Sequence, residues 1–173
     1  MKIVILSDTH DNVPNLNKIV LWMIEQKITI GIHCGDITSL STLKEGLGNF
    51  SGTLHVVFGN ADADEFETAK SPFNYQPQIK TWGELGEIEL AGKKIAFLHN
   101  PDLARHLAES QKYDIVFYGH THKPWKENCG KTKLVNPGNV AGIFYKPTFA
   151  VYDTKKDQLT LQIIEKLHES QRK

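Results

Sequence analysis

The feature that most constrains the fold of this chain is a set of five short apolar runs, each followed at once by polar side chains. Each run has the length of a β-strand and is rich in β-branched or aromatic residues. The apolarity is nearly continuous rather than alternating, which predicts strands that are covered on both faces. The runs span residues 3–6, 28–33, 54–58, 95–98 and 115–118.

Helical and hairpin patterns occupy the sequence between and after these runs. A helix is expected over residues 14–26, where apolar residues recur at helical spacing behind Asn12 as a cap and Pro14 in the first turn. The other expected elements are helices over 40–47 and 102–110 and hairpins over 86–98 and 148–165. Because βα units come first and antiparallel pairs later, the sequence predicts an α/β (α+β) fold of two packed mixed β-sheets flanked by helices.

Length and composition bound the class of protein. The 173 residues include 20 basic and 20 acidic side chains, and a net charge of zero gives no electrostatic argument for a nucleic-acid or membrane partner. No apolar run approaches the length of a membrane span, and the two cysteines are typical of reduced thiols. We expect a cytoplasmic protein with a single domain over residues 1–165 and a polar tail over 166–173. Whether it forms a homo-oligomer is left open.

Every apolar run ends in a carboxylate, an imidazole or an amide. The carboxyl ends of strands are where ligands gather in sheet proteins, so these side chains are candidates for one shared site. Three of them follow a glycine (Gly35, Gly59 or Gly119), which is expected to permit a sharp backbone turn. The candidate donors are Asp8, His10, Asp36, Asn60, His99, His120 and His122.

The chemistry of this donor set favours two metal ions over one. Seven nitrogen and oxygen donors without a thiolate are too many for a single tetrahedral zinc ion. They suit two divalent ions of higher coordination, with Mn2+ as the expected metal and Ni2+, Fe2+, Co2+ or Zn2+ as alternatives. Two ions about 3.5–4 Å apart lower the pKa of a shared water and clamp the attacking and leaving oxygens of a phosphoryl centre.

The order of these motifs resembles the calcineurin-like metallophosphoesterases. The matching motifs are Asp8-x-His10, Gly35-Asp36, Gly59-Asn60, His99 and Gly119-His120-x-His122. The short chain, Asn60-Ala61-Asp62 and Asn136-Pro137-Gly138 are most similar to the small YfcE-type phosphodiesterase branch. The resemblance runs from Lys2 to about Tyr152 and implies a four-layer sandwich with the metals at one edge.

The resemblance also implies a role for each donor. It places Asp8, His10, Asp36 and His122 on the first metal and Asp36, Asn60, His99 and His120 on the second, so that Asp36 bridges the two ions. The implied catalytic residues are Asp36, Asn60 and His99, and Asn60 is also an implied substrate contact. Asn100, which follows His99, either adds a hydrogen bond to the phosphate or is a turn residue.

The expected function is a dinuclear metal-dependent phosphodiesterase that acts on a small phosphodiester by attack of a metal-bridging hydroxide. The chain departs from most of the superfamily at Ala61, where a histidine usually contacts phosphate or assists the leaving group. Cysteine occupies this position in many small-branch relatives, so the departure does not imply loss of activity. The alternatives are a non-enzymatic scaffold, since a retromer subunit shares this fold, and a phosphomonoesterase or dinucleotide polyphosphate hydrolase.

Three residues near the donors have an ordinary structural interpretation. His33 and His55 fall inside apolar runs and are expected to be hydrogen-bonded core residues rather than ligands. Cys34 lies beside Gly35-Asp36, where the carboxylate already supplies the metal ligand. It is expected to be a buried structural thiol.

Overall fold

The computed structural model describes residues 1–62 and 78–167. The polar segment 63–77 and most of the expected C-terminal tail lie outside the described residues. The strands of the described part form two sheets, one of six strands and one of five.

The six-stranded sheet has the order β11–β10–β1–β2–β3–β4. Strands β1 to β4 are parallel, and β10 pairs with β1 antiparallel. The register aligns Leu6 with His33 and His33 with Val56, so that β1, β2 and β3 end level at one edge. The strands are β1 (Lys2–Leu6), β2 (Ile30–His33), β3 (Thr53–Val56), β4 (Gln78–Thr81), β10 (Thr148–Asp153) and β11 (Gln158–Ile163).

The five-stranded sheet has the order β5–β6–β7–β9–β8. Its central strands β6, β7 and β9 are parallel, and the two outer strands are antiparallel to their neighbours. The strands are β5 (Leu85–Leu90), β6 (Lys93–Leu98), β7 (Ile115–Phe117), β8 (Trp125–Cys129) and β9 (Thr132–Asn136).

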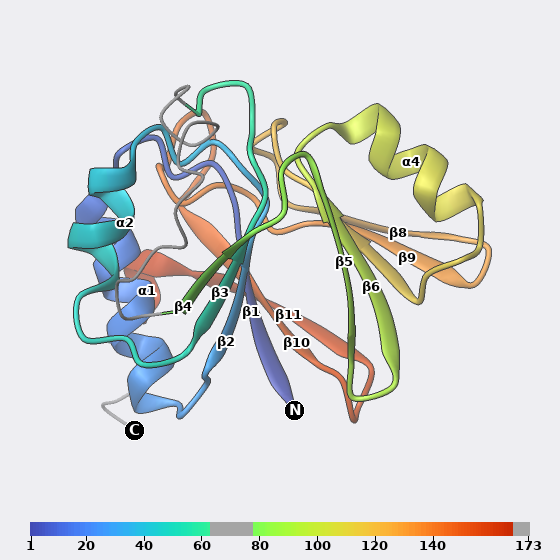
Figure 1. Cartoon of the computed structure of the whole chain (residues 1–173), viewed down its shortest axis with the longest axis horizontal. Helices are drawn as coiled ribbons and strands as arrows, with labels where there is room; N and C mark the ends of the chain where they lie inside the picture. Colours follow the sequence, from blue (N-terminus) through green and yellow to red (C-terminus); the bar gives the residue numbers. More distant parts are fainter. Residues whose placement is uncertain (63–77, 168–173) are drawn as a thin grey trace.

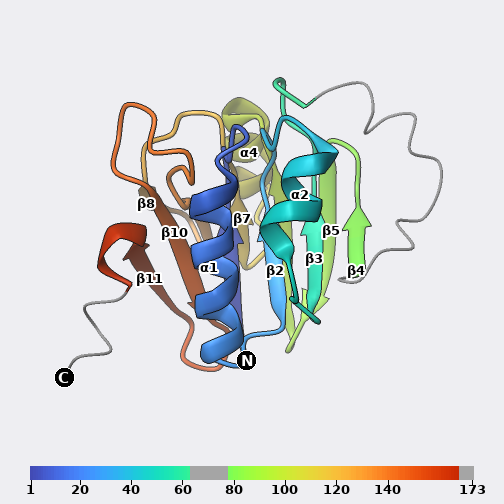
Figure 2. The same ribbon diagram turned by 90° about the vertical axis from the view of Figure 1, so that its left-hand side faces the viewer.

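The helices cover the two outer faces of the paired sheets (Figures 1 and 2). Helices α1 (Val13–Glu25) and α2 (Leu40–Leu47) pack on the six-stranded sheet, α4 (Pro101–Glu109) packs on the five-stranded sheet, and a short 3-10 helix spans Ile164–Lys166. Among the described residues, three buried apolar clusters separate these layers: one under α1 and α2, one between the sheets and one under α4. The predicted fold of two packed mixed sheets flanked by helices is confirmed.

Both faces of the central strands are buried, as their continuous apolarity predicts. In β1, Val4 belongs to the cluster under α1, while Ile3 and Ile5 belong to the cluster between the sheets. The predicted helices and both predicted hairpins are present within two residues of the expected bounds. None of the described helices is both long enough and apolar enough to span a membrane.

Three strands, β4, β8 and β9, were not expected from the sequence. The hairpin of β8 and β9 has an outer strand, Trp125–Cys129, in which no residue is buried. Strand β4 adds to the edge of the six-stranded sheet beside β3. Strands β4 and β8 are edge strands, which need only one partner and little apolar surface, so the period-2 and burial patterns that indicate central strands are weak in both. Strand β9 is central and largely buried, but Leu134 and Val135 are its only apolar residues.

Candidate metal centre

All seven predicted donors lie just beyond the carboxyl ends of five strands, and both sheets contribute. They follow β1 (Asp8 and His10), β2 (Asp36), β3 (Asn60), β6 (His99) and β7 (His120 and His122). These strands are parallel within each sheet, so their loops meet at one edge of the sandwich, the upper edge in Figure 1. The structure brings all seven together there.

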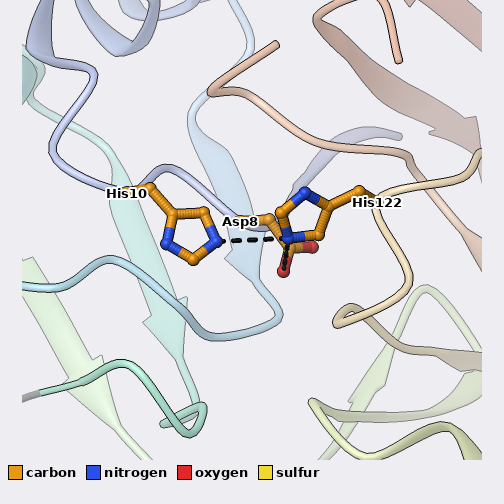
Figure 3. Close-up of side chains that lie close together, drawn as sticks. All are labelled: Asp8, His10 and His122. Atoms are coloured by element: carbon orange, nitrogen blue, oxygen red, sulfur yellow. Dashed lines mark hydrogen bonds and ion pairs between the residues drawn. The ribbon is translucent and has the colours of Figure 1, made fainter. Parts of the chain in front are cut away.

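The first group of donors, the first triad, consists of Asp8, His10 and His122. The Nε2 atoms of His10 and His122 are 3.2 Å apart, and Nε2 of His122 is 3.4 Å from Oδ1 of Asp8. Figure 3 shows the two imidazole rings facing each other nitrogen to nitrogen beside the Asp8 carboxylate. The ligand atoms of all three side chains lie within 4.8 Å of one another.

The second group, the second triad, consists of Asp36, His99 and His120. Nε2 of His99 is 3.3 Å from Oδ2 of Asp36 and 3.2 Å from Nδ1 of His120. Asn60 extends this group, because its Oδ1 lies 3.0 Å from Nε2 of His99 and 2.9 Å from Nδ1 of His120.

The carboxylate of Asp36 lies between the two triads. Its Oδ2 atom is 3.3 Å from Nε2 of His99 in the second triad and 3.6 Å from Nε2 of His10 in the first. One oxygen therefore faces both groups, while Oδ1 accepts a hydrogen bond of 2.8 Å from the N–H of Ala61.

Five of the seven donors have a left-handed backbone conformation. Such positive φ values are uncommon outside glycine and cost on the order of 1 kcal/mol or more each. They gather at ligand sites, where the surrounding structure holds them in place. The φ angles are 53° for Asp8, 42° for His10, 57° for Asp36, 70° for His120 and 58° for His122.

The glycines before the donors serve two different purposes. Gly35 has a φ of +90°, which supplies the turn that its position predicts. At Gly59 and Gly119 the constraint is space rather than backbone angle. A Cβ atom would lie 2.1 Å from Oδ1 of Asp36 at Gly59 and 2.1 Å from Oγ of Ser7 at Gly119. Any larger residue at either position would displace the Asp36 or Ser7 side chain.

Burial and proximity set the protonation of the central groups. Burial raises the pKa of Asp8 to about 6 despite its hydrogen bond with Ser7. For Asp36, burial also favours the neutral form, but hydrogen bonds from His99 and the Ala61 N–H outweigh it and lower the pKa. For His99, burial opposes the charged form, yet the hydrogen bond to Asp36 raises the pKa. A proton on His99 and a divalent ion would thus compete for the same carboxylate.

Asp62 holds the loop that carries Asp36. Its two carboxylate oxygens accept hydrogen bonds from the backbone N–H groups of Asp36 (3.0 Å), Ile37 (2.6 Å), Thr38 (2.8 Å) and Gly59 (2.6 Å). This clamp joins the loops after β2 and β3. Sequence analysis missed this role, because Asp62 bonds to a loop about 25 residues earlier in the chain.

The backbone and buried residues beneath the site orient its imidazoles. Nδ1–H of His99 donates to the carbonyl of Cys34 at 2.8 Å, which directs Nε2 toward Asp36. Nδ2 of Asn139 donates to the carbonyl of His122 at 3.0 Å. This hydrogen bond was not predicted, because Asn139 and His122 are 17 positions apart and no local pattern links them.

The three residues given an ordinary structural interpretation are core residues, as predicted. His33 accepts the Gly35 N–H at Nδ1 and contacts Oγ1 of Thr9 through Nε2 at 2.7 Å, and burial lowers its pKa to about 3. Nδ1 of His55 accepts a hydrogen bond from Trp82. The Cys34 thiol is fully buried, and burial raises its pKa.

Asn100 has a structural role in the fold. Its Oδ1 accepts hydrogen bonds from the N–H groups of Asp102 (2.9 Å) and Leu103 (3.0 Å) and caps α4. These bonds agree with the turn interpretation of Asn100. Its contact with substrate remains a prediction.

The residues present fit divalent metal ions. Oδ2 of Asp8 and Nδ1 of His122 are buried without a hydrogen-bond partner, and buried polar atoms are seldom left in that state. The imidazole nitrogens point at one another within each triad, so that their lone pairs converge. Nitrogen and oxygen donors without sulfur suit first-row divalent ions. The described residues thus form two candidate metal sites that share one edge of the sandwich.

Comparison with known protein families agrees with this geometry. The family model of the calcineurin-like phosphoesterase superfamily domain matches residues 1–157. Phosphodiesterase MJ0936 of Methanocaldococcus jannaschii is 30% identical over 168 residues, which cover 95% of this chain and 100% of that protein.

Solved structures show the same fold. A structure described as a novel archaeal phosphodiesterase superposes with a TM-score of 0.85 at 28% identity, over 94% of this chain and 99% of that one. YfcE, a phosphoesterase from E. coli, gives 0.65 at 16% identity over 95% and 100% of the two chains. Vps29 from Chaetomium thermophilum gives 0.67 at 19% identity over 93% and 83%. The chain belongs to the calcineurin-like phosphoesterase superfamily and is a metal-dependent phosphoesterase.

Proposed function

We propose that the protein is a dinuclear metal-dependent phosphodiesterase that hydrolyses small phosphodiesters. The observation that carries the proposal is the position of Asp36, whose Oδ2 faces His99 of the second triad at 3.3 Å and His10 of the first at 3.6 Å. A carboxylate oxygen in this position is suited to join two ions. The relative named a phosphodiesterase, which this chain matches over nearly all of its length, supports the same activity.

The proposed ligand sets follow the two groups of side chains. Asp8, His10 and His122 hold the first ion, and His99, His120 and Asn60 hold the second, with Asp36 shared. When bound, the two ions supply an activated water and neutralise the charge that develops on the phosphoryl oxygens.

The chain's own groups keep these donors in position. The Cys34 carbonyl fixes the tautomer of neutral His99, so that its Nε2 lone pair is directed into the site. The Asp62 clamp and the Ala61 N–H hold the Asp36 carboxylate. Each of these contacts restricts the donor side chains before an ion binds, so that less conformational entropy is lost on binding. Pre-organisation of this kind strengthens a metal site.

A diester is the favoured substrate because of the residues next to Asn60. Ala61 has no side-chain group that can contact a second phosphate charge or protonate a poor leaving group. Both oxygens of Asp62 already accept backbone N–H groups, so the site gains no free acid from that residue. A diester carries one negative charge fewer than a fully ionised monoester, and it requires less neutralisation.

The test compares paired substrates after the protein has been stripped with chelator and reloaded with Mn2+. We expect bis(p-nitrophenyl) phosphate to be hydrolysed at least about tenfold faster than p-nitrophenyl phosphate, in terms of kcat/KM. A preference for the monoester would contradict the diesterase assignment. Loss of turnover on both, in protein shown to hold metal, would favour the scaffold alternative, whose fold the Vps29 structures share.

A further inference from the structure

Three consecutive apolar side chains are exposed beside the first triad. Ile143, Phe144 and Tyr145 form what we call the aromatic loop, with exposed fractions of 39%, 89% and 44%. The Phe144 ring centroid lies 5.9 Å from that of the His122 imidazole. An exposed run of apolar residues adds nothing to the core, so such a run needs a functional reason.

The base of the aromatic loop is bonded to the segments that carry the metal ligands. The N–H groups of Val140 and Ala141 donate to the carbonyls of Ser7 (2.9 Å) and Asp8 (3.0 Å). Asn139 also bridges the two regions. Its Oδ1 accepts the N–H groups of Gly142 and Ile143 while its Nδ2 donates to the carbonyl of His122.

Helix α1 fixes the same loop from the other side. Nδ2 of Asn12 donates to the carbonyl of Ala141 at 3.0 Å, and Nδ2 of Asn15 donates to the carbonyl of Val140 at 2.8 Å. The position of the loop relative to His122 is therefore set by hydrogen bonds rather than by burial of its own side chains.

The backbone of Phe144 is strained as well as exposed. Its φ of +63° is left-handed, which is an outlier for a bulky aromatic residue. Strain of this kind persists where the surrounding structure imposes it, and it clusters at ligand clamps. Exposure and strain occur together at Phe144, whose ring lies beside the metal ligand His122.

The surroundings of the metal centre differ from one side to the other. On the side of the second triad, the described residues Asn60 and His120 place polar groups at the surface. On the side of the first triad, the neighbour of His122 is the Phe144 ring. Among the described residues 1–62 and 78–167, a substrate with an anionic centre at the ions would thus have this apolar surface beside the first triad.

We propose that Phe144 is a specificity-determining residue that stacks against a planar aromatic ester group of the phosphodiester substrate. The inference rests on the proposed phosphodiesterase function and names the class of substrate: diesters in which one ester group is an aryl ring or a nucleobase-bearing nucleoside. A ring that contacts a ligand imidazole is within reach of an ester group attached to the phosphorus. Stacking between aromatic faces supplies the preference.

The first test holds the leaving group constant and varies the other ester group. The substrates are p-nitrophenyl diesters whose second group is methyl, cyclohexyl, phenyl or 5′-thymidyl, with Mn2+-loaded protein. We expect kcat/KM for the phenyl ester to exceed that for the methyl ester about tenfold, with cyclohexyl between them. A phenyl preference without a thymidyl preference assigns the site to aryl esters, and a preference for both includes nucleotides.

The variants separate stacking from general disruption. Phe144→Ala should reduce kcat/KM for the phenyl ester about tenfold, with a much smaller loss for the methyl ester, whereas Phe144→Tyr should keep the phenyl preference. Leu161→Ala removes an exposed apolar side chain from edge strand β11 and should leave all four rates unchanged. An equal loss on all esters in Phe144→Ala would overturn the proposal. A change of oligomeric state without a change in ester preference would overturn it too, and would assign the loop to a protein contact.

A binding measurement separates this inference from the proposed function. Calorimetry should show that Mn2+-loaded protein binds phenylphosphonate about tenfold more tightly than methylphosphonate, and that Phe144→Ala removes the difference. If no diester is hydrolysed but this difference is found, the proposed function fails and the aromatic site stands. If diesters are hydrolysed but neither binding nor kcat/KM depends on the ring, the aromatic site fails and the diesterase stands.

Discussion

The two edges of the sandwich lie between the same two sheets but differ in the groups that face their carboxylates. At the metal edge, Asp8 and Asp36 meet imidazoles from the five-stranded sheet. At the other edge, which we call the charge-paired edge, Asp157 in the turn before β11 meets Lys93 at 3.9 Å and forms an ion pair with Lys133. Lysines thus neutralise the carboxylate at the charge-paired edge. Among the described residues, no lysine takes part in the ion pairs of the metal edge.

Within the described ranges, the metal edge lacks the positive charge that the charge-paired edge contains. At the charge-paired edge, the Tyr152 hydroxyl also donates to Asp157 at 2.6 Å, so that each oxygen of the carboxylate has a partner in the protein. At the metal edge, the buried Oδ2 of Asp8 has no partner, and five donors have left-handed backbones. The first arrangement stabilises the fold by itself. The arrangement at the metal edge places carboxylates and imidazole lone pairs together, and it requires bound cations to balance them.

The largest expected effect comes from removing one carboxylate at each edge. Asp36→Asn should lower phosphodiesterase kcat/KM more than about 100-fold, since loss of a group that merely supports a ligand already costs 10- to 100-fold. Asp157→Asn should change kcat/KM less than about twofold, because its partners Lys93 and Lys133 lie at the opposite edge. The measurement is steady-state hydrolysis of bis(p-nitrophenyl) phosphate. Near-equal effects of the two variants would remove the functional distinction between the edges.

A second comparison concerns carboxylates that accept backbone N–H groups at each edge. Asp62→Asn should lower kcat/KM about tenfold or more and destabilise the fold by roughly 2–3 kcal/mol, because the amide has one acceptor oxygen for four N–H groups. The matched control is Asp153→Asn, which alters the two N–H contacts of the turn after β10 and should leave kcat/KM unchanged. Denaturant unfolding and kinetics provide the readouts. Unchanged activity in Asp62→Asn would show that the clamp does not position Asp36.

Adding Mn2+ to metal-free protein should raise its thermal stability through the metal edge and not through the charge-paired edge. A ligand that binds only the folded state at 100 times its Kd stabilises it by about 2.7 kcal/mol, which corresponds to a rise in Tm of about 5–10 °C for a chain of this size. We expect this rise when Mn2+ is added to chelator-treated protein, in the wild type and in Asp157→Asn alike. In Asp36→Asn the rise should be less than half as large. Differential scanning calorimetry measures it, and a full rise in Asp36→Asn would be inconsistent with a shared ligand.

The smallest expected effect is the pH dependence of the charge-paired edge. The hydrogen bond from Lys133, followed by that from Tyr152, lowers the pKa of Asp157 in the folded state. A lowered pKa gives stability that is present above the unfolded value, near 4, and is lost as the pH falls through the folded value. The side chain is 44% exposed, so solvent screening limits the contribution to about 1 kcal/mol or less. Unfolding curves between pH 5 and pH 2.5 should therefore fall less steeply for Asp157→Asn than for the wild type.

The buried strands and the seven donors that follow them could be predicted from the sequence, because a local pattern of residues marks both. The buried strands were evident because Ile3, Ile5 and their counterparts are apolar on both faces. The seven donors were evident because each follows such a strand. Strand β8 was missed because an outer strand with no buried residue carries no such pattern, and β9 was missed because Leu134 and Val135 are its only apolar residues.

The contacts that support the site could not be predicted from the sequence. Asp62 bonds to a loop about 25 residues away, and Asn139 bonds to His122, so their roles depend on how distant loops meet. Phe144 gave no signal, because a single aromatic residue in a loop is equally compatible with burial and with exposure. The role of each of these residues depends on neighbours that are close in space but distant in sequence.

The number of Mn2+ ions bound per chain, measured by equilibrium dialysis with elemental analysis, tests whether two divalent ions that share Asp36 complete the metal edge. The wild type and Asp157→Asn should each bind two ions, whereas Asp36→Asn should bind both ions at least about tenfold more weakly. One ion or none in the wild type at saturating Mn2+, or an Asp36→Asn variant that retains both at full affinity, would contradict the account.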